Sequence, residues 1–394
     1  MSDASAVVTL KKREDKRIRS GHLWIFSNEI ESVEGSVTAG DTVYVHDASG
    51  RFLGTGYMNP HSLIAVRLVS RSRVSIDVPF VSKRVSDAIS LRERLFPGER
   101  VWRAVYSEAD LLPGLVVDRY DETVVIQSLT AGMERRLDAV VEALEDRLHP
   151  GTVVLRNDSP MRRYEELPEE KRVLKGTVND PVEIEQDRLR FLVDVLNGQK
   201  TGFFLDQREN RRATARLAEG QDVLDCCCYT GAWSVYAASA GAASVTGVDS
   251  SAAAVDLAAR NLQLNAPGVE SRFMKGDVFK EMAGMRRAGR EYGLVVLDPP
   301  SFARSRKKIR EALKAYRALN RLALSLMKPG GHLVTCTCSH LVERDAFMNA
   351  LVDAAREAGR RARVIGVRGQ SMDHPVILGL PETAYLTCAI LEII

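Results

Sequence analysis

Four aspartates in the C-terminal half of the sequence stand where strand-like apolar runs end: Asp225, Asp249, Asp277 and Asp298. Ligands of open α/β sheets bind at the carboxyl ends of the strands, so these acids are candidates for one shared site. The interval from Asp225 to Asp249 is near the spacing of about 20 residues at which an acid reaches the ribose of a nucleotide-like ligand. Because carboxylates accept from hydroxyl groups and amines, we expect a ligand built from adenosine and an amino acid, with Asp249 on the ribose.

The turn after Asp225 contains Tyr229-Thr230-Gly231, where the glycine lets the backbone approach a ligand closely. The complete G-x-G-x-x-G fingerprint of dinucleotide-binding proteins is absent, and no basic or glycine-rich cradle for phosphates accompanies the acids. Each aspartate taken alone could be a helix N-cap, and Gly231 a plain turn. The four acids together favour a ligand site.

Strand-like and helical stretches alternate from about residue 185 onward. Strands are expected over residues 223–225, 245–249, 292–298 and 332–338, with helices near residues 232–239 and 252–264. Such alternation is typical of an α/β fold with a parallel sheet covered on both faces. The strand-like residues 385–394 follow those at 361–365 after a long loop, which predicts a final antiparallel hairpin at the sheet edge.

The residues before 185 predict two smaller domains. Short β-runs at residues 42–45, 52–57 and 63–68, separated by turn residues, indicate a small β-barrel within residues 1–75. Residues 76–184 predict a modest α+β domain, in which a helix over residues 81–95 ends before Pro97-Gly98. The polar, proline-interrupted residues 160–175 are expected to connect this domain to the third, residues 185–394.

Composition restricts the class of protein further. The 394 residues exceed what one hydrophobic core normally supports, and 45% hydrophobic with 27% charged residues is an ordinary globular composition. Six cysteines without a CxxC pair or a histidine cluster predict neither a disulfide framework nor a zinc site. We find no signal peptide and no membrane span, so we expect a cytoplasmic protein. The net charge of +3 is too small to indicate a nucleic-acid partner.

Several of these segments resemble known motifs. Asp225 to Gly231, Asp249, Gly276-Asp277-Val278 and Asp298-Pro299-Pro300-Ser301-Phe302 resemble the class I S-adenosylmethionine-dependent methyltransferase pattern. Residues 201–208 (TGFFLDQR), the Asp-Pro-Pro-Ser-Phe segment and Asp373-His374-Pro375 resemble the bacterial large-subunit ribosomal RNA cytosine-C5 methyltransferase family, over nearly the whole chain. Leu23 and the triple cysteine at residues 226–228 depart from that family's pattern.

The resemblance implies a Rossmann-like catalytic domain with a mostly parallel seven-stranded sheet, preceded by a PUA-like RNA-binding domain and a small middle domain. It implies S-adenosylmethionine as the cofactor and RNA, specifically 23S ribosomal RNA, as the partner. The cofactor contacts that it implies are Gln207, Asp225, Tyr229, Gly231, Asp249, Asp277, Val278 and Asp298. Whether the protein forms a homodimer stays open.

Cys338 is the predicted nucleophile. C5 of cytosine is too electron-poor to accept a methyl group directly, and addition of a thiolate at C6 activates it. Thr337-Cys338-Ser339 resembles the Thr-Cys-Ser element that supplies this cysteine in RNA cytosine-C5 methyltransferases. Cys336, two residues earlier on the same strand face, is the reserve. The alternative for both cysteines is a small buried hydrophobic residue.

Asp298 is expected to bind the N3 and N4 edge of the base, while Pro299-Pro300 forms a ledge where a flipped base could stack with Phe302. Phe302 could instead belong to the core. The base that removes the C5 proton stays open, with His340 or a water conceivable. His374 could line the substrate pocket or be a structural histidine.

Two basic clusters suggest a polyanion. Arg304, Arg306, Lys307, Lys308 and Arg310 directly follow the Asp-Pro-Pro-Ser-Phe segment, and a second cluster spans residues 11–19. The alternative for the first cluster is a solvated helix start. Trp24 and Phe26, next to the second cluster, are expected to be barrel core rather than stacking platforms.

Two other functions stay possible at this point. One is a methyltransferase that modifies a guanine nitrogen of ribosomal RNA, which requires no covalent nucleophile. The other is a non-catalytic RNA-binding factor in ribosome assembly. The presence of all four acids argues against this function, because a degenerate site would tolerate their loss.

Overall fold

The computed structural model describes residues 4–303 and 305–394, so Arg304 lies outside the described residues. The chain divides into two compact units. Unit 1 consists of the chain up to Val182, Asp194–Leu205 and Met372–Thr383. Unit 2 consists of Glu183–Val193, Asp206–Ser371 and Ala384–Ile394. The expected division into three domains at residues 75 and 184 stays a prediction.

The first part of unit 1 is a six-stranded sheet, as the short β-runs predict. Its strands are β1 (Ala6–Leu10), β2 (Trp24–Phe26), β3 (Ile30–Gly35), β4 (Asp41–His46), β5 (Phe52–Met58) and β6 (Ile64–Ser70). They are ordered β2-β6-β5-β4-β1-β3, with the short helices α1 (Lys16–Arg19) and η1 (Ser27–Glu29) between strands. In β1 the buried Ala6, Val8 and Leu10 alternate with partly exposed residues, which is the period of a strand with one face on a core.

A five-stranded sheet forms the second part of unit 1. Its strands are β7 (Val101–Tyr106), β8 (Leu115–Tyr120), β9 (Thr123–Ser128), β10 (Thr152–Asn157) and β11 (Glu170–Lys175), in the order β11-β10-β9-β8-β7. The helices are α2 (Val78–Leu95), η2 (Ser107–Asp110), α3 (Ala131–Glu134), α4 (Leu137–Leu148) and η3 (Pro160–Glu165). Helix α2 begins because Asp77 caps it by accepting from the Phe80 amide. Its buried residues, among them Val81, Val85 and Ala88, lie on one face.

The expectation that residues 160–175 are only a connection is wrong. Residues 160–165 form η3, and β11 pairs antiparallel with β10 at the edge of the sheet. The residues of β11 are all exposed or only partly buried. Because an edge strand with charged side chains carries no apolar alternation, its sequence resembles that of a loop.

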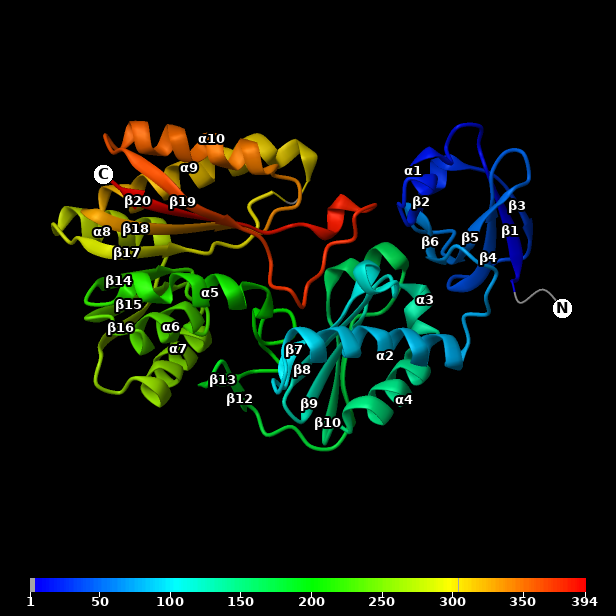
Figure 1. Ribbon diagram of the computed structural model, residues 1–394, viewed down its shortest axis with the longest axis horizontal. Coiled ribbons are helices and arrows are strands. Elements are labelled where there is room, and N and C mark those ends of the chain that lie inside the picture. The colour runs from blue at the N-terminus through cyan, green and yellow to red at the C-terminus, as the bar shows by residue number, and fades with distance from the viewer. Residues whose placement is uncertain (1–3, 304) are drawn as a thin grey trace. The chain divides into compact units, whose positions relative to one another are not determined.

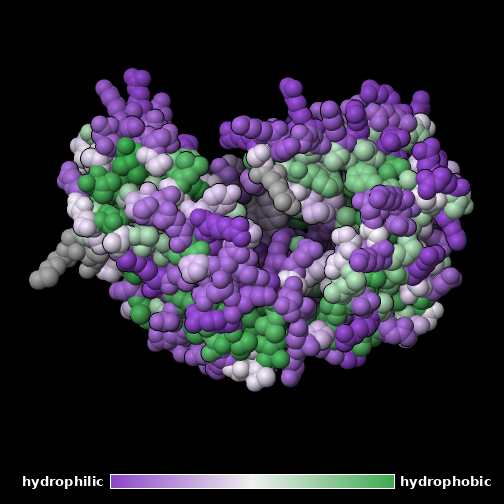
Figure 2. Space-filling view, turned by 180° about the vertical axis from the view of Figure 1, so that it is seen from behind, coloured by the Kyte–Doolittle hydropathy of each residue, from purple (hydrophilic) through white to green (hydrophobic). Residues whose placement is uncertain are grey.

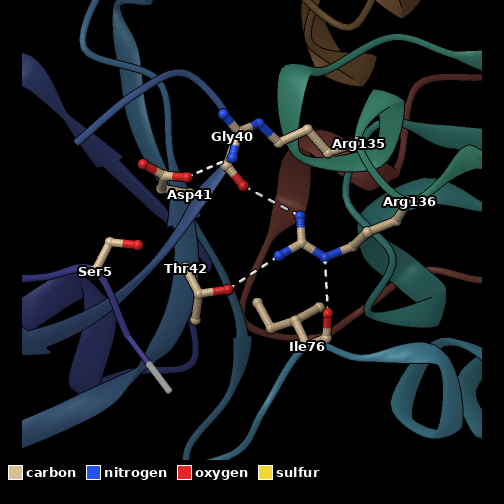
Figure 3. A pocket seen from close by; sticks show the side chains of 7 residues that line it. All are labelled: Ser5, Gly40, Asp41, Thr42, Ile76, Arg135 and Arg136. Carbon is tan, nitrogen blue, oxygen red and sulfur yellow. Dashed lines mark hydrogen bonds and ion pairs between the residues drawn. The ribbon is translucent and has the colours of Figure 1, made fainter. Parts of the chain in front are cut away.

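Arg136, which precedes α4, bonds to the first sheet of unit 1 and to the segment before α2 (Figure 3). Its guanidinium donates to the Ile76 carbonyl at 3.0 Å, the Gly40 carbonyl at 3.1 Å and the Thr42 hydroxyl at 2.9 Å. These groups, with Ser5, Asp41 and Arg135, line a cavity of ~450 Å³. Because most of its donors are already satisfied by the protein, Arg136 acts as a structural clamp.

The core of unit 2 is a seven-stranded, mostly parallel sheet, as expected from the sequence. Its strands are β14 (Asp222–Cys226), β15 (Ser244–Asp249), β16 (Glu270–Lys275), β17 (Tyr292–Leu297), β18 (Met327–Thr337), β19 (Ala362–Arg368) and β20 (Thr387–Ile393). The order is β16-β15-β14-β17-β18-β20-β19, in which only β20 runs antiparallel to its neighbours β18 and β19. The predicted antiparallel end of the sheet is therefore confirmed, with β20 lying inside the edge strand β19.

Helices cover both faces of this sheet (Figure 1). One face carries α5 (Arg208–Ala215), α6 (Ala232–Ser239) and α7 (Ala252–Asn265), and the other carries α8 (Val278–Arg287), α9 (Ile309–Ser325) and α10 (Arg344–Glu357). The remaining elements are β12 (Val182–Gln186) and β13 (Leu189–Val193), which pair as a hairpin, and the short helices η4 (Leu205–Gln207), η5 (Arg216–Ala218), η6 (Arg306–Lys308) and η7 (Pro381–Thr383). The doubly covered α/β sheet predicted from the sequence is confirmed.

The surface agrees with a globular composition. Hydrophilic side chains cover most of the face shown in Figure 2, with smaller apolar areas between them. Within the described ranges, no helix combines the length and the apolar character needed to cross a membrane.

Candidate cofactor and catalytic site

The carboxyl ends of adjacent strands bring three of the predicted acids to one edge of the sheet. Strand β14 lies between β15 and β17, and its Cys226 pairs in register with Val248 on one side and Leu297 on the other. Asp225 precedes Cys226, Asp249 ends β15, and Asp298 directly follows β17. The three carboxyl groups are therefore neighbours across the strands.

Asp225 is fully buried. Its Oδ2 accepts from the Ser234 amide at 3.1 Å and from the Ser234 hydroxyl at 2.7 Å. Its Oδ1 has no hydrogen-bond partner among the described residues. Burial raises the pKa of Asp225 to about 7, and the nearby Asp298 adds to the rise, although the bonds from Ser234 oppose it. Asp225 thus offers a buried oxygen to a ligand.

The turn from β14 to α6 has an unusual backbone. Cys227 and Tyr229 have positive φ angles of 61° and 47°, although neither is glycine, and Gly231 has φ 76°. Asp249 holds this turn, because its Oδ2 accepts from the Tyr229 amide at 2.9 Å and its Oδ1 from the Ser251 amide at 2.9 Å. Positive φ values of non-glycine residues are concentrated at functional sites, where the surrounding structure maintains them.

The charges of all four predicted acids act on the thiol of Cys227. Burial raises the pKa of the Cys227 thiol, followed in size by the charges of Asp249, Asp298, Asp225 and Asp277. All four predicted acids are therefore near enough to this side chain to act on it electrostatically.

Asp277 and Val278 begin α8. Asp277 is exposed and caps the helix, because its Oδ1 accepts from the Lys280 amide at 3.0 Å. Val278 is buried. Asp277 thus has the N-cap contact that its sequence position also allowed, while it stays near enough to influence Cys227.

Two side chains fix the carboxyl group of Asp298. Gln207 Nε2 donates to its Oδ1 at 3.0 Å, and Trp233 Nε1 donates to its Oδ2 at 3.0 Å. Asn210 in turn donates to Gln207 Oε1 at 2.7 Å, which fixes the orientation of the amide. Burial raises the pKa of Asp298 and the bond from Trp233 opposes the rise, so this carboxyl group holds a proton more readily than an exposed one.

Cys338 lies one residue beyond the end of β18, beside the Asp298 segment. Its Sγ is 3.9 Å from the Pro299 carbonyl oxygen, and the side chain is only partly buried. Cys336 is fully buried and lies opposite Cys388 of β20. Burial holds the pKa of Cys336 well above its ordinary value, with Cys388 adding to the rise. Of the two cysteines, Cys338 is the accessible one.

Comparison with known proteins decides the family. Residues 8–71 match the family described as PUA-like domain, and residues 159–368 match the family described as S-adenosylmethionine-dependent methyltransferase. The protein named ribosomal RNA large subunit methyltransferase I of Alteromonas mediterranea is 37% identical over 393 residues, which cover 99% of each chain. The protein of the same name from Aeromonas hydrophila is 38% identical over 97% of this chain and 98% of its own. The chain belongs to this S-adenosylmethionine-dependent methyltransferase family.

Solved structures agree on the fold of the methyltransferase. A putative SAM-dependent methyltransferase from Streptococcus mutans superposes with a TM-score of 0.82 at 20% identity, covering 98% of this chain and 99% of its own. A putative methyltransferase solved in complex with SAH gives a TM-score of 0.82 at 21% identity, with the same coverage. The expected PUA-like and Rossmann-like architecture and the cofactor S-adenosylmethionine are therefore confirmed.

The acceptor groups of the methyltransferase fit this cofactor. The free Oδ1 of Asp225 can accept from an amine or a hydroxyl group, and each oxygen of Asp249 retains a lone pair beside the backbone amide that it binds.

The described contacts of His374 lie within unit 1. It lies in the Met372–Thr383 segment of unit 1, where it is buried, with Nδ1 2.8 Å from Asp373 Oδ1. Its ring centroid is 5.1 Å from that of Tyr106. Of the two interpretations that the sequence left open, these contacts support a structural histidine. His340, by contrast, is exposed two residues beyond Cys338.

Sequence reasoning missed three side chains that act on the predicted acids. Trp233 follows the β14 turn in a helix without any recognised motif. Asp206 lies within the recognised TGFFLDQR segment and could have been singled out; it adds to the rise in the pKa of Asp298. Arg211 lies one helical turn after Gln207, so helical spacing alone could have found it. Burial lowers the pKa of Arg211, and the nearby groups that oppose this shift include Asp298 and Asp225.

The basic clusters differ in how many of their charges are paired. Arg306, Lys307 and Arg310 are exposed and form no ion pair within the described part of the chain, whereas Lys308 pairs with Glu311 at 2.7 Å. In the N-terminal cluster Arg17 pairs with Glu29, and Arg19 with Asp15 and Asp47, while Lys12, Arg13 and Lys16 are exposed.

Trp24 and Phe26 are only partly buried. The indole N–H of Trp24 donates to Glu108 at 2.8 Å, and Trp24 packs against the core of the first sheet. The guanidinium of Arg17 lies 5.0 Å from the Phe26 ring centroid. For Trp24, packing against the core agrees with the core role favoured from the sequence.

Proposed function

We propose that this methyltransferase forms 5-methylcytidine in large-subunit ribosomal RNA, with Cys338 as the covalent nucleophile. The proposal rests on one observation above all. The accessible thiol at the end of β18 lies 3.9 Å from the carbonyl of Pro299, the residue after Asp298. Cys338 would bond to one side of a pyrimidine ring and Asp298 would bind the opposite side. The two residues must therefore lie close enough to contact the same ring.

The chain's own residues account for the activation of the base. The thiolate of Cys338 adds to C6 and breaks the C5–C6 double bond, so that C5 gains electron density. Asp298, whose pKa is raised by burial, can share its proton with N3 and disperse the negative charge of the adduct. When bound, S-adenosylmethionine supplies an electrophilic methyl group. A base, for which His340 and a water are the candidates, then takes the C5 proton, and its electron pair restores the double bond as the C6–S bond breaks and the thiolate leaves.

The proposed cofactor contacts are those expected from the sequence. Asp249 would bind the ribose, Asp225 the amino-acid part, and Gln207, Tyr229, Gly231, Asp277, Val278 and Asp298 would complete the site. The turn held by Asp249 and the partnerless oxygen of Asp225 support this assignment.

Three observations support an RNA substrate. Residues 8–71 match the PUA-like domain family, exposed cations follow the Asp-Pro-Pro-Ser-Phe segment, and the named relatives are ribosomal RNA methyltransferases. The unpaired charges of Arg306, Lys307 and Arg310 would bind phosphates and guide a nucleotide to Asp298. Such a substrate places the expected site of action in the cytoplasm.

The test is methylation of ribosomal RNA by the purified protein with labelled S-adenosylmethionine, followed by mass spectrometry of the nucleosides. We expect labelled 5-methylcytidine from the wild type, and none from Cys338→Ala. Cys388→Ala, which removes a buried cysteine from the neighbouring strand, is the matched control and should stay active. A labelled methylguanosine, or full activity of Cys338→Ala, would refute the proposal, and failure of the protein to bind the cofactor in calorimetry would favour a non-catalytic role.

A further inference from the structure

A buried tyrosine connects the two loops that carry the proposed chemistry. Tyr316 of α9 is fully buried, and its phenol oxygen accepts from the Thr337 hydroxyl at 2.8 Å. The same phenol oxygen lies 3.4 Å from the Ser339 hydroxyl. Ser339 Oγ is in turn 2.5 Å from Ser301 Oγ. Thr337 and Ser339 flank Cys338, and Ser301 belongs to the Asp298 segment.

The ring of Tyr316 is itself held in place. The Phe302 ring centroid lies 4.8 Å from the Tyr316 centroid, and that of Phe347 on α10 lies 5.3 Å away at an interplanar angle of 82°. Burial raises the pKa of Tyr316, so the phenol stays protonated and can donate while it accepts from Thr337. Phe302 therefore has a packing role beside any contact that it makes with a base.

These contacts determine where the Cys338 backbone lies. Both residues that flank the cysteine bond to one phenol, and the Ser339 amide also donates to the Thr337 hydroxyl at 3.3 Å. Cys338 follows Thr337, the last residue of β18 that pairs with β20. The hydroxyl groups of Thr337, Tyr316, Ser339 and Ser301 bond to one another on both sides of Cys338.

We propose that Tyr316 is a positioning residue that holds the Cys338 thiol in register with the Asp298 segment. Tyr316 is fully buried and acts through the residues that flank Cys338. The inference rests on the proposed function, because it assumes that Cys338 is the nucleophile. Well-oriented reacting groups contribute large factors to a rate, and a misplacement of about 1 Å can cost about 100-fold.

The decisive variant is Tyr316→Phe, which keeps the ring and removes only the hydroxyl group. With S-adenosylmethionine present, RNA containing 5-fluorocytosine traps the adduct of Cys338, because after methyl transfer fluorine stands in place of the C5 proton whose loss would release the enzyme. We expect the rate of trapping to fall by about 10- to 100-fold, with the KM for RNA and the Kd for S-adenosylhomocysteine unchanged. Tyr292→Phe is the matched control, because the Tyr292 hydroxyl donates to Met285 at the opposite end of β17 and should not affect trapping.

Variants of the partner hydroxyls separate positioning from stability. Thr337→Val should slow trapping, whereas Thr337→Ser, which keeps the hydroxyl group, should trap at the wild-type rate. In the double variant, Thr337→Val should add little to the effect of Tyr316→Phe, because both changes remove the same hydrogen bond. Tyr316→Phe could lower only the melting temperature and still form the adduct at the wild-type rate when assayed well below that temperature. This result would overturn the inference while the proposed function stands. If Cys338→Ala still forms the adduct, the proposed function fails and the positioning role fails with it.

Discussion

Asp225 and Asp249 end neighbouring strands, yet their surroundings assign them different roles. Both oxygens of Asp249 accept from backbone amides, so this residue shapes the turn as well as the proposed ribose site. Asp225 instead keeps one buried oxygen without a partner among the described residues. The sequence predicted both positions from the ends of apolar runs. It could not predict the difference, which depends on residues such as Ser234 that approach from helices.

The raised pKa of Asp225 predicts a pH-dependent stability. Because its folded-state pKa of about 7 exceeds its ordinary value of 3.8, the stability that Asp225 contributes is fully present below about pH 4 and is lost as the pH rises through 7. Asparagine does not titrate. The free energy of unfolding of the wild type, relative to Asp225→Asn, should therefore fall by about 1.4 kcal/mol per pH unit between pH 4 and 7.

Urea denaturation of both cofactor-free proteins at several pH values measures this difference. A difference that stays constant with pH would show that Asp225 has an ordinary pKa in the folded protein.

We predict that Trp233 sets the pKa of Asp298. Its indole N–H lowers the pKa of that carboxyl group, so Trp233→Phe should raise the pKa further. If protonated Asp298 assists the adduct, the alkaline limb of the pH–rate profile should move up by about one pH unit. Trp102→Phe is the control, because its indole N–H donates to the Glu99 carbonyl in unit 1. A limb that stays in place in Trp233→Phe would contradict the role assigned to Asp298.

At the scale of the elements, alternation of strand and helix predicted the architecture of unit 2. The apolar runs at residues 245–248 and 294–297 are those that the parallel sheet buries, and the helices expected near residues 232–239 and 252–264 are α6 and α7. The position of β20 between β18 and β19 could not be predicted, since pairing between distant strands leaves no local pattern. Strand β11 was missed because its exposed side chains carry no apolar alternation.

The turn between β14 and α6 predicts a specific cost for Gly231→Ala. A side chain at Gly231 would meet two penalties, its φ of 76° and a Cβ only 2.8 Å from the Ala258 Cβ of α7. Gly220→Ala is the matched control, since Gly220 has φ 67° but open space around it. We expect Gly220→Ala to lower the free energy of unfolding by about 1 to 2 kcal/mol and Gly231→Ala by clearly more.

Urea denaturation of the two variants separates the cost of the positive φ from the cost of the close contact with Ala258. Calorimetry should show weaker cofactor binding for Gly231→Ala alone. Equal losses of stability in the two variants would mean that α7 yields to the added methyl group.

At the scale of the whole molecule, the two units are interleaved along the chain. Unit 1 is completed by Asp194–Leu205 and Met372–Thr383, each of which lies between segments of unit 2. In unit 1 the Thr201 hydroxyl bonds to Asp118, and Asp373 Oδ2 accepts from the Arg103 amide at 2.9 Å. The recognised TGFFLDQR and Asp-His-Pro motifs thus include residues that complete unit 1, which motif matching alone could not show.

Because the two units are interleaved, we expect Met372–Thr383 to lose stabilising contacts when residues 185–394 are expressed alone. In the full chain Asp373 accepts from Arg92 and Arg103, and His374 packs against Tyr106, all of which the shorter chain lacks. Hydrogen exchange should therefore show strong protection of the backbone amides of Met372–Thr383 in the full protein. This protection should be lost in the protein that consists of residues 185–394 alone. Equal protection in both would show that the segment is held within its own half of the chain.

Interleaving also orders events during synthesis. Met372–Thr383, which supplies Asp373 and the buried His374 to unit 1, is translated only after Asp206–Ser371 of unit 2. The hydrogen bonds from Arg92 and from the Arg103 amide to Asp373 therefore cannot form until most of unit 2 has been translated. Premature termination before residue 372 would leave both units unfinished, and quality control should recognise such a product as misfolded.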